Sequence, residues 1–206
     1  MSMFALIAIL ALAAPPAAAA TTTPASSVAI AGHGSCFIVY GDNWAFMAEA
    51  PKGWLAACGD QALQSTVFTL WPSNESPQAL KTIMYVTVSS LGHDGLDDFV
   101  KGDIETAVNR DAKSRKANVR QPPMHVGKVR TVSATRRLVH FEHDSGDRDE
   151  LVEYIKGPTA YFIVALSTLS PAQTARYRGA FQAFLKSFSP MTVQFEKGAK
   201  PPSSKH

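Results

Sequence analysis

The sequence predicts an α+β fold in which an antiparallel β-sheet, arranged as a meander, is flanked by two main helices. Short runs of β-branched and aromatic residues alternate with two segments of helical periodicity. The last four strand-like runs follow one another through loops that are too short for a parallel crossover. These strands must therefore run antiparallel.

The expected strands are separated by turn signals rich in glycine, proline, asparagine and aspartate. The first two runs flank Gly41-Asp42-Asn43 and form either two strands or one bent strand. The expected strands are Cys36–Tyr40, Trp44–Glu49, Trp54–Cys58, Ser65–Trp71, Ile83–Ser89, Val126–Val132, Thr135–His143, Glu150–Lys156 and Ala160–Thr168.

Both helices have recognisable ends. The first is predicted over Gly95–Lys116, with Asp94 as its N-cap and further acidic residues in its first turn. The second begins after the cap Ser170 with a proline in its first turn, and it ends before Pro190. Its apolar stripe, which we expect to face the sheet, consists of Tyr177, Phe181, Phe184, Leu185 and Phe188.

The first twenty residues have the layout of a secretory signal peptide. An apolar run of about eleven residues is followed by two prolines and a tract of alanines, and it is too short to span a membrane as a helix. We therefore predict a secreted or periplasmic protein without a transmembrane anchor. The expected organisation is a signal peptide (1–20), a flexible mature N-terminus (21–34), one α+β domain (35–190) and a disordered basic tail (191–206).

The charge balance argues against a nucleic-acid partner. The chain has 20 Lys and Arg against 17 Asp and Glu, and the resulting charge of +3 is expected to be spread along the chain. One basic concentration, formed by Arg110, Lys113, Arg115 and Lys116, falls at the end of the first helix, where it favours the helix dipole.

Two cysteines, Cys36 and Cys58, lie in the part of the chain that would be exported. An oxidising compartment favours a disulfide between them. Closing this loop of 23 residues would stabilise the fold by roughly 3 kcal/mol. The alternative is a reactive or metal-binding thiol pair, but the spacing is far from the C-x-x-C arrangement of redox and zinc sites.

The order of elements and one local motif resemble the PsbP/Mog1-like family over about Cys36 to Phe188. The motif is Ala50-Pro51-Lys52-Gly53-Trp54, followed by the strand Met84-Tyr85-Val86-Thr87-Val88 and the helix, meander and aromatic helix described above. The resemblance implies an α/β/α sandwich in a family of mainly accessory or binding proteins, which include photosystem extrinsic subunits and a small-GTPase partner. It implies no catalytic residue set, and the photosystem role is not transferred.

The densest polar cluster surrounds a predicted hairpin loop between His140 and Asp149. His140, Glu142, His143 and Asp144 are candidate ligands for a divalent cation, because imidazole and carboxylate groups bind zinc and related metals. His140 and Glu142 share one face of the strand, whereas His140 and His143 point to opposite faces unless the strand bends. The alternative is a solvated hairpin tip.

Three tryptophans, Trp44, Trp54 and Trp71, either fill the core or line a ligand groove. Trp54 and Trp71 are the candidate ligand-binding residues. No nucleophile elbow and no glycine-rich phosphate loop is present in the sequence.

The function that these observations favour is a non-enzymatic accessory or binding protein outside the cytoplasm, which needs no cofactor and acts on an envelope protein or a small ligand. The alternative is a divalent-metal-binding module or metal-dependent hydrolase that uses the His140–Asp149 hairpin.

Overall fold

The computed structural model describes residues 29–31, 36–58, 66–77, 79–92, 95–117, 124–142 and 148–192. The predicted signal peptide and nearly all of the predicted tail lie outside these residues. None of the described helices is long and apolar enough to cross a membrane.

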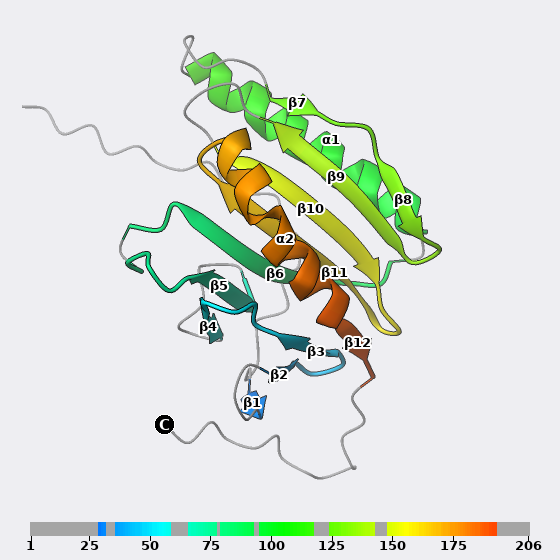
Figure 1. Ribbon diagram of the computed structural model, residues 1–206. Coiled ribbons are helices and arrows are strands. Elements are labelled where there is room, and N and C mark those ends of the chain that lie inside the picture. The colour runs from blue at the N-terminus through cyan, green and yellow to red at the C-terminus, as the bar shows by residue number, and fades with distance from the viewer. Residues whose placement is uncertain are drawn as a thin grey trace, which may run out of the picture.

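The predicted α+β class is confirmed: two helices accompany two antiparallel sheets (Figure 1). The small sheet has the order β1-β2-β3-β12. The large sheet has the order β4-β5-β6-β11-β10-β9-β7, and β8 also pairs with β9. The bounds are β1 Ala29–Ala31, β2 Cys36–Tyr40, β3 Ala45–Glu49, β4 Trp54–Cys58, β5 Phe68–Pro72, β6 Thr82–Ser90, α1 Leu96–Ala117, β7 His125–Val126, β8 Arg130–Ser133, β9 Arg136–Glu142, β10 Asp149–Lys156, β11 Ala160–Thr168, α2 Pro171–Ser187 and β12 Ser189–Met191.

The two faces of the large sheet bury separate apolar clusters, because neighbouring side chains of a strand point to opposite faces. Val152 and Tyr154 of β10 lie in the cluster beneath α1, while Leu151 and Ile155 of the same strand lie in the cluster beneath α2. Figure 1 shows the corresponding layers, with α2 across one face of the sheet and α1 across the other.

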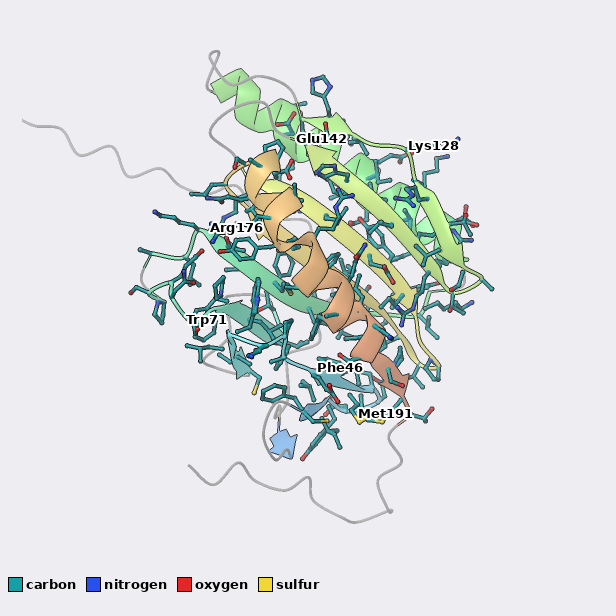
Figure 2. All side chains as sticks on the ribbon, viewed as in Figure 1. Phe46, Trp71, Lys128, Glu142, Arg176 and Met191 are labelled. Atoms are coloured by element: carbon teal, nitrogen blue, oxygen red, sulfur yellow. The ribbon has the colours of Figure 1, made fainter. Side chains whose placement is uncertain are left out.

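Aromatic rings join the small sheet to α2. Phe46 of β3 is fully buried and stacks on Phe188, which follows α2, with ring centroids 4.7 Å apart. Figure 2 shows Phe46 beneath the end of α2. The predicted apolar stripe of this helix is confirmed, since Phe181, Phe184 and Leu185 are all buried in the same cluster.

The two ends of α2 are held by polar groups. Ser170 caps the N-terminus, as predicted, and its hydroxyl accepts a hydrogen bond from the backbone N–H of Gln173. At the other end the guanidinium of Arg136 donates to the carbonyls of Leu185 and Phe188, both at 3.1 Å. Strand β9 is thereby tied to the final turn of the helix.

Three strands differ from the sequence prediction. β1 lies within the stretch predicted as a flexible N-terminus, and it pairs with β2. β12 forms directly after α2 and pairs with β3, so the expected single sheet is accompanied by a second one. The predicted strand Val126–Val132 is divided into β7 and β8, because residues 127–129 pair irregularly with β9.

Candidate functional site

His140 lies at the centre of the predicted hairpin cluster, and its imidazole contacts two carboxylates. Its Nδ1 atom is 2.8 Å from Oε1 of Glu142, and its Nε2 atom is 3.0 Å from Oδ2 of Asp149. The expectation that His140 and Glu142 share a face of the strand is therefore confirmed. An imidazole can donate to both partners only when both of its nitrogens carry hydrogen, which is the imidazolium form.

Asp149 is completely buried, and its carboxylate continues into α2 through two threonines. The hydroxyl of Thr174, in the first turns of α2, donates to Oδ2 of Asp149. Thr174 is also 2.7 Å from the hydroxyl of Thr168, which donates to the carbonyl of Ser170 at the helix cap. A buried carboxylate needs such donors to offset its desolvation. The network joins β9 and β10 to the start of α2.

Only two of the four predicted metal ligands, His140 and Glu142, lie within the described residues. His143 and Asp144 lie outside the residues that the structure describes. Among the described residues, no three His, Cys, Asp or Glu side chains are arranged to hold a metal ion. Glu142 and Asp149 approach different nitrogens of one imidazole, so the three groups do not surround a common point.

The two candidate ligand-binding tryptophans lie on opposite faces of the sheet. Trp54 of β4 is opposite Pro72, and its neighbour Leu55 is opposite Trp71. Trp71 therefore shares a face with Leu55 and not with Trp54. The structure does not bring the two indoles together in one groove.

Each of these tryptophans has its own surroundings. Trp54 packs edge-on against Tyr177 of α2, with ring centroids 5.6 Å apart at an interplanar angle of 86°. Trp71 is half-buried on β5, and its indole N–H is buried without a hydrogen-bond partner in the described structure (Figure 2). Trp44, by contrast, contacts Phe46 and Phe162 in the core.

The predicted disulfide is wrong in this structure. Cys36 and Cys58 are both free thiols, and each is half-buried. Cys36 begins β2 in the small sheet, whereas Cys58 ends β4 in the large sheet. Burial raises the pKa of the Cys58 thiol, which lowers its reactivity at neutral pH.

A second polar group lies beneath α1, where two tyrosines donate to carboxylates. The hydroxyl of Tyr154 is 2.6 Å from Oδ2 of Asp103, and that of Tyr85 is 3.3 Å from Oε1 of Glu150. Burial, reinforced by the adjacent carboxylates, raises the pKa of both phenols well above their ordinary value. Both tyrosines are thus neutral donors, and the bond from Tyr154 to Asp103 attaches α1 to the sheet.

The most exposed polar surface of the sheet is its outer edge along β7 and β8, which we call the basic edge (residues 125–133). All four residues of β8 are exposed, and Val132 is the extra residue of a β-bulge opposite β9. Lys128 and Arg130 are exposed, and Figure 2 shows Lys128 at this margin of the sheet. Val129 and Val132 are exposed to 38% and 52%.

The charge of this edge is part of a pattern that the sequence prediction missed. Residues 112–141 contain eight Lys and Arg and no Asp or Glu, so the rest of the chain carries 12 basic and 17 acidic side chains. The charge is therefore segregated, contrary to the prediction that it is spread along the chain. A count of acidic residues along the sequence reveals this stretch without a structure.

Comparison with known proteins gives similarities of fold. No family model and no curated protein matches the chain. A solved structure of cyanobacterial PsbP (CyanoP) from Synechocystis is similar at 15% identity and a TM-score of 0.49, covering 81% of this chain and 98% of that one. The protein of unknown function PA94 from Pseudomonas aeruginosa is similar at 13% identity and a TM-score of 0.41, covering 82% and 100%. Both likenesses concern the fold alone.

Proposed function

We propose that this chain is an exported accessory protein that binds a partner through the basic edge and does not transform a substrate. The observation that carries the proposal is the exposure of this edge, where cationic and apolar side chains stand together at the margin of a sheet. Interaction surfaces commonly combine exposed apolar side chains with a polar rim.

The arrangement of the other polar groups supports the same function. His140, Asp149 and Thr174 hold the start of α2 against the sheet, and Arg136 holds its end. Tyr154 and Asp103 attach α1 in a similar way. Each of these groups has a structural task that accounts for its burial and hydrogen bonds.

Export is part of the proposal and rests on the first twenty residues of the sequence, with their short apolar run and alanine tract. Fractionation of the native cell with a C-terminally tagged full-length chain tests it. The expected product in the extracytoplasmic fraction has a mass about 2 kDa lower than that of the 22.1 kDa chain, because a signal of roughly twenty residues has been removed. A full-length product in the cytoplasm would contradict export.

Binding is tested by photo-crosslinking from the basic edge. A photoreactive residue at Thr131 is expected to capture a specific partner in the native envelope, while the same residue at Arg178 on α2 serves as the matched control. Substrate turnover by the purified protein in broad hydrolase screens would overturn the proposal.

Titration calorimetry distinguishes the proposed partner binding from the alternative function. That alternative is a divalent-metal site at His140, Glu142, His143 and Asp144. A metal that binds His140 must displace a carboxylate hydrogen bond from one of its nitrogens. We expect no binding of zinc, manganese or calcium tighter than about 100 µM, which corresponds to roughly −5.5 kcal/mol. Tighter binding that is lost in H140A would favour the metal site.

A further inference from the structure

The outer edge of the large sheet ends in backbone groups that no described strand pairs with. β7 and β8 both pair with β9, and both lie on the side of β9 that faces away from β10. In an edge strand, half of the backbone N–H and C=O groups point away from the sheet and can pair with another chain. Among the described residues, no strand pairs with the outer side of residues 128–133, so their outward backbone groups can take part in such pairing.

The charge of this edge determines which segment can add there. Lys128 and Arg130 are exposed and have no ion-pair partner among the described residues. Residues 125–133 contain no Asp or Glu. The two cations thus leave this margin with a net positive charge.

A second copy of the same chain is a poor occupant. Antiparallel pairing of two identical edges in the register centred on Val129 would place Lys128 of one copy opposite Arg130 of the other. Like charges opposite one another destabilise a strand pair. An acidic segment gains from the same positions, and its apolar side chains can cover Val129 and Val132.

From these observations we propose that the basic edge binds an extended acidic segment of a partner protein, which adds to the large sheet as a further strand. This inference rests on the proposed binding function and names the chemistry of its partner. Main-chain hydrogen bonds would supply affinity, while alternate side chains of the added strand supply specificity. Acidic residues beside Lys128 and Arg130, with β-branched residues between them, are the expected pattern.

The test uses a decapeptide display library that is panned on the purified full-length protein. The enriched sequences are expected to alternate Asp or Glu with Val, Ile or Thr. The best peptide is then synthesised in two forms, one unmodified and one with alternate amide nitrogens methylated, which keeps its charge but removes donors of one edge. Hydrogen exchange of the protein with and without the unmodified peptide locates the contact.

We expect the unmodified peptide to protect backbone amides within residues 128–133 and to bind several-fold more weakly at 300 mM than at 50 mM salt. The variant K128E/R130E should bind it at least about tenfold more weakly. The matched control R178E/K186E changes the charge of two exposed residues of α2 by the same amount and should change the affinity less than about twofold. Methylation should abolish binding.

Four outcomes would overturn the inference. These are an enrichment without acidic residues, equal binding by the methylated peptide, equal losses in the two double variants, or stronger binding to anionic phospholipid vesicles or DNA than to the peptide at the same salt concentration. If this test fails while Thr131 still crosslinks a specific partner, the proposed binding function stays in place, whereas substrate turnover would remove that function itself.

Discussion

The guanidinium of Arg136 lies 3.1 Å from the carboxylate of Glu153, and the same group caps the final carbonyls of α2. Glu153 is only 4% exposed, so its charge depends on this one cation. Burial raises the pKa of Glu153, and the interaction with Arg136 partly opposes that rise. The pair therefore joins β9 and β10 to the end of α2, and its contribution to the stability of the fold depends on pH.

Replacing Arg136 with methionine should destabilise the fold by about 2–4 kcal/mol at neutral pH, because Glu153 is left buried without a counter-charge. The pKa of Glu153 then rises further. A carboxyl with a raised pKa in the folded state contributes stability that is present below its ordinary value of 4.5 and lost as the pH rises. The deficit of the variant should therefore shrink on acidification from pH 7.5 to pH 5. Urea unfolding of both proteins at the two pH values measures this loss of stability. An equal loss at both pH values would contradict the dependence on the charge of Glu153.

The hydroxyl of Thr174 should contribute more to the free energy of unfolding than its methyl group does. Thr174→Val keeps the shape but removes the donor to the buried Asp149, and we expect a loss of about 1–3 kcal/mol. Thr174→Ser is the matched control because it retains the hydroxyl. Urea unfolding of both variants should show the larger loss for valine, and the reverse order would refute a structural role for this hydrogen bond.

Tyr85 and Tyr154 should resist ionisation in the folded protein. Burial, with the nearby Glu150 and Asp103, raises the pKa of both phenols above the ordinary value of 10. The stability that they contribute is present below pH 10 and is lost as the pH rises further. In an ultraviolet titration, these two of the five tyrosines should ionise only as the protein unfolds. In Y154F one of the late ionisations should disappear.

Both cysteines should titrate as thiols in the denatured, unreduced protein. In the native protein Cys58 should react more slowly, because burial raises its pKa and the thiolate is the reactive form. A thiol reagent with mass-spectrometric detection measures the two sites separately, and C58S identifies the slower one. A reducing agent should leave the midpoint of unfolding unchanged. A lower midpoint in the presence of reductant would instead support a disulfide between Cys36 and Cys58.

Local patterns predicted most of the fold. The bounds of both helices, the cap at Ser170 and the antiparallel meander follow from periodicity, capping and loop length, which all act over a few residues. The second sheet was missed because its strand β12 pairs Ser189 with Met47, and no local signal links these positions. The cysteine prediction failed for a related reason, since the same separation into two sheets places Cys36 and Cys58 in different ones.

The candidate site was predicted less completely. Face alternation correctly placed His140 beside Glu142, but it could not show that Asp149, nine residues away, completes the contact. The exposed edge at Lys128 and Arg130 was missed because the charge was judged by its total and not by its position. Exposure of Val132 depends on a bulge, which arises from the pairing of two strands and is not encoded by one of them.

The pairing of β12 with β3 has a consequence for the order of folding. The backbone N–H of Glu49 at the end of β3 donates to the hydroxyl of Ser187 at the end of α2, so groups 138 residues apart in the chain lie in contact. Contacts of such separation slow folding because the loop must close before they form. The first strands therefore stay incomplete until the last helix has been synthesised.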